Sequence, residues 1–240
     1  MATETKDPKS SNNDLLENPE AIVEQISKSE EFVKSNFKII TGVLVLIAAG
    51  IGGFIYMNNQ SAENEKLAQL DLYKAQYYFN IDSLNLALNG DTAGAMGLLD
   101  IAEDHDGTKA GNLANYLAGA CYLKKGEFDK AIEYLSKFES GDMLVQARAY
   151  AMLGDAFSEK GDQDNAISNY KKASEYKANE YLTPNYLMKL ALAYELNGQL
   201  ASAIESYEKL EDEFPNAQEI GDAKKYLARA RAMESQDKAQ

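Results

Sequence analysis

The chain has 240 residues, a formal net charge of −14 at pH 7, 45% hydrophobic residues and 26% charged residues. This composition is typical of a globular protein with one or two domains. The strong acidity argues against a nucleic-acid partner, because binding phosphates requires clustered lysine and arginine side chains. The single cysteine, Cys121, rules out an intrachain disulfide, and the single histidine, His105, argues against a multi-ligand metal site.

The N-terminal stretch, residues 1–38, carries five lysines against eight acidic residues. Residues 1–17 are rich in serine, asparagine and charged side chains, a composition that predicts disorder. The triplet Asn-Pro-Glu at 18–20 predicts a helix start, with a capping residue, a proline in the first turn and an acid near the positive helix end. The short helix that follows either docks a partner or lies at a membrane surface without one.

Residues 39–57 read IITGVLVLIAAGIGGFIYM and contain no charged side chain. As a helix they would span about 28 Å, which matches a hydrocarbon core of roughly 30 Å. Phe37 and Tyr56 lie near the two ends, where membrane spans carry interfacial aromatic residues. No small-residue cleavage site follows, so we predict an uncleaved transmembrane anchor rather than a signal peptide. A buried helix of a soluble protein is the alternative.

The lysines around this span predict its orientation. Lys28, Lys34 and Lys38 lie within about 15 residues on the N-terminal side, and only Lys66 lies as close on the other side. Because lysine and arginine are retained on the cytoplasmic side, the N-terminus is predicted to be cytoplasmic and residues 58–240 to be exported.

Small residues inside the span form two pairs with four-residue spacing, Ala48 with Gly52 and Ala49 with Gly53. This spacing lets a second membrane helix approach closely. The pairs therefore predict a packing face, although glycine is also common in membrane helices that have no specific partner.

The exported part repeats one helical pattern. Gly126, Gly161 and Gly198 follow each other at near-constant spacing, close to the 34-residue period of the tetratricopeptide repeat. The sequence is similar to that repeat, in which glycine ends the first helix and small residues allow the paired helices to cross closely. Asn115 replaces the large aromatic residue in the first copy, and Ala191 replaces the small glycine in the third. The middle copy is the most complete, with Tyr150, Leu153, Gly154, Phe157, Ala166, Ile167, Tyr170 and Ala173.

These patterns predict an all-α fold, with a single N-terminal transmembrane helix followed by a tetratricopeptide-repeat α-solenoid. Upstream of the clear repeats, a helix lined by apolar and tyrosine residues and a second helix over residues 92–102 would form a divergent repeat. The predicted domain order is residues 1–38, the span 39–57, a divergent repeat 63–110, repeats of about 112–142, 147–180 and 184–215, and a capping helix 216–235.

The inner helices of such a solenoid form a concave surface. In related repeats that hold a C-terminal carboxylate, a clamp of Lys, Asn and Arg does so, and the acidic Asp155 and Glu159 have the wrong sign for it. We therefore expect an extended peptide or a partner protein on this face, unless the protein's own helices fill it. The candidate residues are Tyr116, Ala120, Leu123, Arg148, Ala151, Asp155, Ser158, Glu159, Asn185, Met188, Leu192 and Glu195.

Two residues invite a chemical interpretation. His105 lies among acidic residues, but the spacing matches neither an EF-hand loop nor an HExxH helix, so a polar turn between helices is predicted. Cys121 lies on a packed repeat helix with no histidine nearby, which favours a small buried hydrophobe over a nucleophile. We predict no enzyme activity, no cofactor and no metal.

The residues around the span resemble a known family. The stretch 31–36, Glu-Phe-Val-Lys-Ser-Asn, leads into a glycine-rich span that ends with Phe-Ile-Tyr at 54–56. Together with the repeats, this resembles the YfgM family of ancillary subunits of the bacterial SecYEG translocon, although the repeat signatures here are clearer than that family's.

The resemblance implies an inner-membrane protein with a periplasmic repeat domain that partners SecYEG and a PpiD-like periplasmic foldase in handling newly secreted proteins. The alternative is a repeat scaffold for another cell-envelope machine, in outer-membrane protein assembly, protein secretion or cell division.

Overall fold

The computed structural model describes residues 23, 27 and 30–238, and in this part of the chain all regular structure is helical, as predicted. The chain divides near residue 60 into two units. The helices are α3 (Phe37–Asn80), α4 (Leu84–Asn89), α5 (Leu98–Asp104), α6 (Lys109–Lys124), α7 (Phe128–Lys137), α8 (Met143–Glu159), α9 (Gln163–Glu175), α10 (Thr183–Leu196), α11 (Leu200–Glu213) and α12 (Ile220–Asp237).

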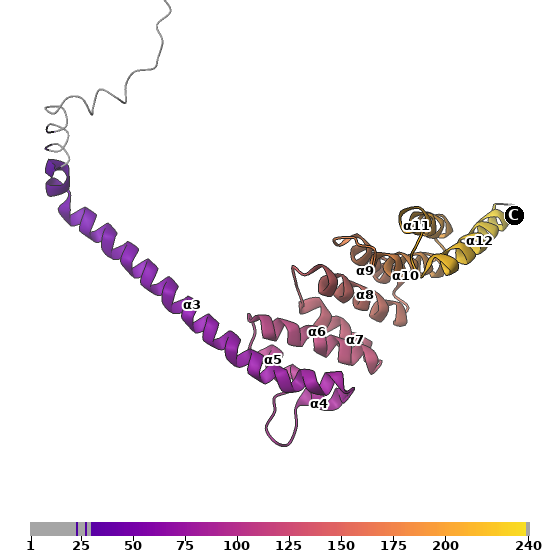
Figure 1. The fold of residues 1–240 in the computed structure, drawn as a ribbon, viewed down its shortest axis with the longest axis horizontal. Coiled ribbons are helices and arrows are strands. Elements are labelled where there is room, and N and C mark those ends of the chain that lie inside the picture. The colour runs from indigo at the N-terminus through magenta and orange to yellow at the C-terminus, as the bar shows by residue number, and fades with distance from the viewer. Residues whose placement is uncertain (1–22, 24–26, 28–29, 239–240) are drawn as a thin grey trace, which may run out of the picture. The chain divides into compact units, whose positions relative to one another are not determined.

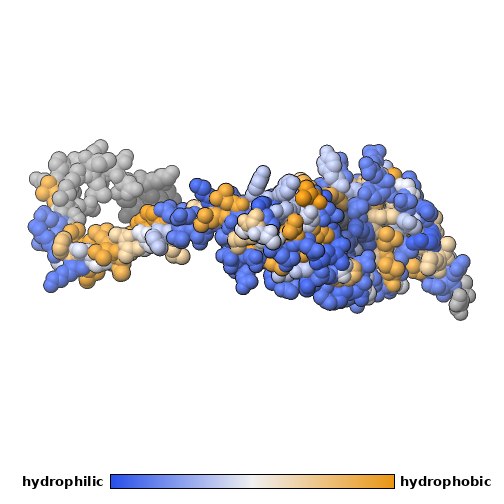
Figure 2. All heavy atoms as spheres, turned by 90° about the horizontal axis from the view of Figure 1, so that it is seen from below, coloured by the Kyte–Doolittle hydropathy of each residue, from blue (hydrophilic) through white to orange (hydrophobic). Residues whose placement is uncertain are grey.

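The first unit contains the apolar part of α3. An 18-residue window of this helix has a mean hydropathy of 2.3, and none of the window is buried, so α3 is long and apolar enough to cross a membrane (Figure 2). Residues 30–35 are also helical and agree with the predicted short helix before the span. The predicted helix start at 18–20 and the predicted disorder of 1–17 lie outside the described residues.

The second unit is a stack of helical hairpins (Figure 1). The pairs α6–α7, α8–α9 and α10–α11 pack internally, each pair packs on the next, and α12 covers the last one. Apolar clusters lie between successive helices and include buried side chains from α3 through α12. The core is therefore continuous along the stack, as repeat proteins require.

The turns inside the three hairpins have the same backbone geometry. Gly126, Gly161 and Gly198 have φ angles of +73°, +78° and +71°, the left-handed region that side chains with a Cβ disfavour. In each turn the residue after the glycine donates its N–H to the carbonyl five residues earlier, at 2.8–2.9 Å. The predicted glycine turns are thus confirmed.

The paired helices cross closely where the sequence has a glycine. A Cβ atom placed on Gly154 would lie 2.6 Å from the ring of Tyr170, and one on Gly119 would lie 2.5 Å from Leu135 Cγ. The third hairpin has Ala191 at this position, fully buried. Small residues therefore set the distance between the two helices of each pair.

The divergent repeat predicted over residues 63–110 differs from the observed helices. The helix predicted over 92–102 begins only at Leu98, and the short α4 was not predicted at all. A helix over 92–102 would begin directly after Asp91, but the Oδ1 of Asp91 accepts hydrogen bonds from the N–H groups of Ala93 and Ala95 at 2.8 and 3.0 Å. The carboxylate thus stabilises the loop before α5, and the prediction of a helix start there was wrong.

Candidate functional site

The inner helices α6, α8 and α10 carry the twelve residues predicted to face a partner, at three levels of exposure. Arg148, Glu159 and Asn185 are exposed. Ala120, Ala151 and Met188 are 7%, 4% and 8% exposed, so these three contribute to packing between helices. The half-buried members are Tyr116, Leu123, Asp155, Ser158, Leu192 and Glu195. That this face contacts a partner stays a prediction.

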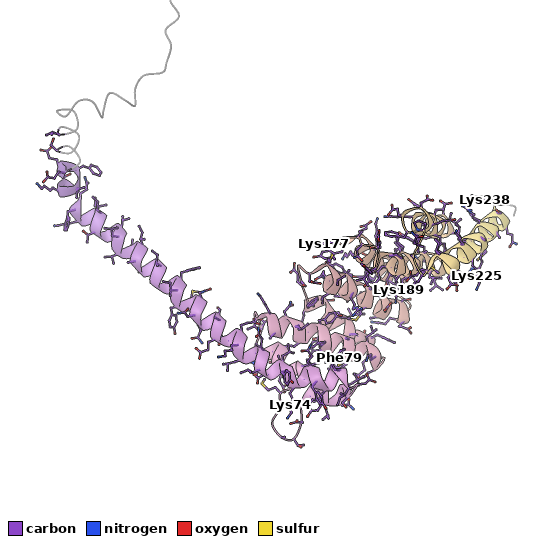
Figure 3. The ribbon with its side chains drawn as sticks, viewed as in Figure 1. Lys74, Phe79, Lys177, Lys189, Lys225 and Lys238 are labelled. Atoms are coloured by element: carbon purple, nitrogen blue, oxygen red, sulfur yellow. The ribbon has the colours of Figure 1, made fainter. Side chains whose placement is uncertain are left out.

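Asp155 on α8 is held by two neighbouring helices. The hydroxyl of Tyr170 on α9 donates to Asp155 Oδ1 at 2.8 Å, and the Nζ of Lys189 on α10 donates to the same oxygen at 2.5 Å. Lys189 is labelled in Figure 3. The ring of Tyr170 passes directly over Gly154 to reach this oxygen. The charge of Asp155 is therefore compensated within the domain.

The same arrangement recurs one repeat later. The hydroxyl of Tyr207 on α11 donates to Glu195 Oε1 at 2.7 Å, and Arg229 on α12 donates to Glu195 Oε2 at 2.6 Å. In both cases the acid and the base are 34 residues apart, which equals the repeat period. Opposite charges at that separation are visible in the sequence, but the predictions from the sequence did not include these pairs.

Burial controls the titration of the two tyrosines. Burial, together with the neighbouring carboxylate, raises the pKa of Tyr170 and of Tyr207 far above the ordinary tyrosine value. Since a buried phenolate beside a carboxylate is strongly disfavoured, both hydroxyls remain donors throughout the neutral range.

Arg148 is the exposed cation of this face. Among the residues that the structure describes, it forms no ion pair. Burial raises the pKa of Tyr116 and of Tyr186, and the guanidinium of Arg148 acts against that rise at both hydroxyls. Arg148 therefore lies between two tyrosines, on α6 and α10, and offers guanidinium donors to a partner.

A groove of about 870 Å³ opens beside the first repeat, between α5, α6 and α7. Asn115 lines this groove at the position where the second repeat has Tyr150, whose ring packs at 6.0 Å from that of Tyr176. The amide of Asn115 donates to the carbonyl of Gly111 at 3.2 Å and fills much less space than an aromatic ring. The predicted weakness of the first repeat at this position thus corresponds to a cavity.

The surroundings of His105 and of Cys121 indicate structural roles for both side chains. His105 follows α5, and its Nε2 lies 2.9 Å from Asp71 Oδ2 on α3, so it links these two helices. Cys121 is fully buried, and burial raises the pKa of its thiol to about 11. Within residues 23, 27 and 30–238, no group of three or more His, Cys, Asp or Glu side chains could hold a metal ion.

The predicted packing face inside the span is exposed on α3. Ala48, Ala49, Gly52 and Gly53 all lie on the surface of that helix, and a Cβ on either glycine would meet nothing within 4 Å. Their role in contacting another membrane helix stays a prediction.

Comparison with known proteins supports the repeat assignment. The tetratricopeptide repeat family matches residues 114–139 and 151–218. FK506-binding protein 5 of Rhizopus delemar is 28% identical over 121 residues, which is 48% of this chain, and the chain spans only 31% of that relative.

Two solved structures of nearly identical TPR-like repeats, from a Podosopora anserina protein assigned to the kinesin light chains, are also similar. One of them carries a single substitution, and each has a TM-score of 0.55 and 15% identity over 73% of this chain and 90% of that chain. At this identity they share the fold alone. Repeats of this type serve as scaffolds for protein–protein contacts. The chain therefore carries tetratricopeptide repeats in an all-helical solenoid, together with one N-terminal helix long and apolar enough to cross a membrane.

Proposed function

We propose that the protein is a non-catalytic, membrane-anchored adaptor that binds partner proteins through the concave face of its repeats. The observation that carries this proposal is that some charged side chains of that face are compensated within the domain and one is not. Asp155 and Glu195 are compensated by bases of the same domain, whereas Arg148 is exposed between Tyr116 and Tyr186 without a carboxylate. An arginine flanked by tyrosines is the kind of anchor that dominates the energetics of protein interfaces.

The proposed location is the bacterial inner membrane, with a cytoplasmic N-terminus and a periplasmic repeat domain. The uncharged span and the excess of lysines before it support this orientation. The proposed partners are the SecYEG translocon, a PpiD-like foldase and newly secreted proteins emerging beside it, on the basis of the resemblance around the span.

Site-specific photo-crosslinking in intact membranes tests the proposal. A photoreactive residue replaces Glu159 or Asn185, which are exposed on inner helices, so that Arg148 is retained, and matched variants carry it at Ser168 on α9 or Glu205 on α11. We expect adducts with translocon subunits, the foldase or secreted proteins from the first two positions only. Equal yields from all four positions would contradict binding at the concave face.

The identity of the adducts also separates the proposal from the alternative scaffold. Adducts with outer-membrane assembly, secretion or division proteins would assign the protein to another envelope machine while leaving the binding face intact.

Limited proteolysis of cells with a permeabilised outer membrane tests the orientation. Digestion of residues 58–240 with protection of the N-terminal stretch is expected. Digestion of the N-terminal stretch alone would invert the proposed location.

A further inference from the structure

The part of α3 that belongs to the repeat domain has two opposite faces. One face packs into the domain, with Ala68 and Ala75 fully buried and Leu72 6% exposed. Phe79 is half-buried on the same face (Figure 3). These residues recur at intervals of three and four, so they form one stripe along the helix. This stripe joins α3 to the first hairpins.

The opposite face is apolar and uncovered. Leu67, Leu70, Tyr77 and Ile81 are 51%, 65%, 55% and 51% exposed, although each is a large hydrophobic or aromatic side chain. Ile81 lies one residue beyond α3 and continues its geometry, because its N–H donates to the carbonyl of Tyr77 at 3.1 Å. Soluble surfaces rarely leave such a contiguous stripe uncovered unless it binds something.

The spacing of the residues along this stripe indicates what kind of partner would bind it. Counting Leu67 as position a of a heptad places Leu70 at d, Lys74 at the next a, Tyr77 at d and Ile81 at a. Residues at a and d form the seam of a coiled coil. We propose that this stripe pairs with the same stripe of a second copy of the chain, as a short parallel two-stranded coiled coil over residues 66–81.

Charge complementarity favours the parallel pairing of two copies. In a parallel coiled coil, position g of one helix faces position e of the next heptad on the other helix. These positions are Lys66 and Asp71. Lys66 forms no ion pair within the described residues, and the Asp71 side chain is 38% exposed, with Oδ2 held by His105. A two-fold axis would therefore create the Lys66–Asp71 pair twice.

Lys74 is compatible with this seam. Its Nζ lies 2.9 Å from Asp91 Oδ2 of the same chain, so its charge is compensated before any partner arrives. A single lysine at an a position specifies register and oligomeric state at some cost in stability. The stripe therefore carries both the apolar contacts and the polar element of a specific dimer.

A second copy of the chain accounts for more features of the stripe than a membrane surface does. Leu67, Leu70 and Tyr77 would each meet their own counterparts, as a two-fold symmetric interface requires. A membrane surface would cover the apolar side chains but would leave the heptad spacing and the Lys66–Asp71 complementarity unexplained. The inference goes beyond the adaptor function and does not depend on which partners the concave face binds.

Cysteine crosslinking of the full-length protein in its membrane tests the proposal. Leu70→Cys and Tyr77→Cys place a cysteine at d, where Cα atoms of paired helices approach within the range of about 4.4–6.8 Å that a disulfide requires. Gln69→Cys and Gln76→Cys are the matched controls, because both residues are exposed and lie one position away from the seam. The unmodified chain is the blank, since Cys121 is buried.

We expect the Leu70 and Tyr77 variants to form disulfide-linked dimers at about tenfold higher yield than the Gln69 and Gln76 controls, because only d positions meet across the seam. Equal yields in all four variants, or no dimer from the d positions, would overturn the proposal. A disulfide-linked adduct with a different protein would overturn it as well.

A second measurement does not depend on disulfide geometry. The mass of the full chain in mild detergent should be that of a dimer, and the double variant Leu70→Glu with Tyr77→Glu should be a monomer. Both residues are exposed within one copy, so the helix content should not change. A monomeric unmodified protein would refute the pairing.

Discussion

The first and second tetratricopeptide repeats, α6–α7 and α8–α9, share the glycine turn and the close helix crossing, yet they differ in what fills equivalent positions. The second has Tyr150 between helix pairs, packed against Tyr176, where the first has Asn115 beside an open groove. Where the paired helices cross, Tyr170 packs against the glycine of the second repeat, and Leu135 packs against the glycine of the first.

This difference shows that, on the same backbone fold, a single side chain can fill the space between helix pairs or leave it as a groove. In the second repeat, aromatic residues fill the space between layers, and the Tyr170 hydroxyl binds the Asp155 carboxylate. In the first repeat, the smaller side chains retain the fold but leave a polar cavity. The contrast can be tested by exchanging residues at matched positions.

The largest effect is expected from Tyr150→Asn, which gives the second repeat the residue of the first. Tyr150 belongs to two apolar clusters, so its loss should destabilise the domain by about 3 kcal/mol, in the range of large-to-small core changes. Chemical denaturation of the full chain in detergent measures this. A loss below about 1 kcal/mol would show that the gap between layers does not need an aromatic ring.

Gly154→Ala should have the next largest effect. The added Cβ would lie 2.6 Å from the Tyr170 ring, so the helices must separate, at a cost of about 2 kcal/mol. Gly221→Ala on α12 is the matched control, because a Cβ there meets nothing within 4 Å. It should stabilise the helix by about 0.5–1 kcal/mol. Destabilisation by both changes to the same extent would contradict a role for close crossing.

Sequence periodicity was sufficient to predict the three hairpins. The reason is that the glycine turns and small crossing residues act locally, within one repeat. Asn115 also departs from the repeat pattern in the sequence alone, and it lines the groove. The repeat signal was weakest upstream, where α4 and the late start of α5 were missed because Asp91 binds loop N–H groups instead of capping a helix.

The charge networks of the concave face were harder to predict. Asp155 is among the residues predicted to face a partner, and its sign was used to argue against a carboxylate clamp, but Tyr170 and Lys189 hold it. Those partners lie on two other helices. The pairing of α8 with α9 inside the repeat brings Tyr170 to Asp155, and the packing of α10 from the next repeat brings Lys189. The exposed state of Arg148 depends on the same packing, so neither residue's availability follows from helix periodicity alone.

Tyr170→Phe tests the hydroxyl that distinguishes the second repeat from the first. It should destabilise the domain by about 1 kcal/mol, because Asp155 loses one hydrogen bond and retains Lys189. Tyr194→Phe is the control, since the Tyr194 hydroxyl has no hydrogen bond to any described residue. A similar loss in both variants would assign the effect to packing.

The pH dependence of unfolding tests the same hydroxyls. The pKa values of Tyr170 and Tyr207 are raised in the folded state, so the folded protein retains protons that the unfolded chain loses above its tyrosine pKa of about 10. Their stabilisation is fully present below pH 10 and is lost progressively above it. The double variant Tyr170→Phe with Tyr207→Phe should show a shallower decline of melting temperature above pH 10 than the unmodified chain. Identical slopes would contradict the shifts.

The smallest effect is expected from the reciprocal exchange, Asn115→Tyr, which gives the first repeat the residue of the second. The groove of about 870 Å³ provides room for a ring, and the lost bond from Asn115 to the Gly111 carbonyl is long at 3.2 Å. Stability should therefore change by less than about 1 kcal/mol. Asn112→Tyr is the matched control in the same groove, because Asn112 makes two hydrogen bonds to the backbone of Glu139, at 2.7 and 3.2 Å. Its loss should cost about 2 kcal/mol. If Asn115→Tyr costs as much as Asn112→Tyr, Asn115 supports the first repeat rather than leaving it open.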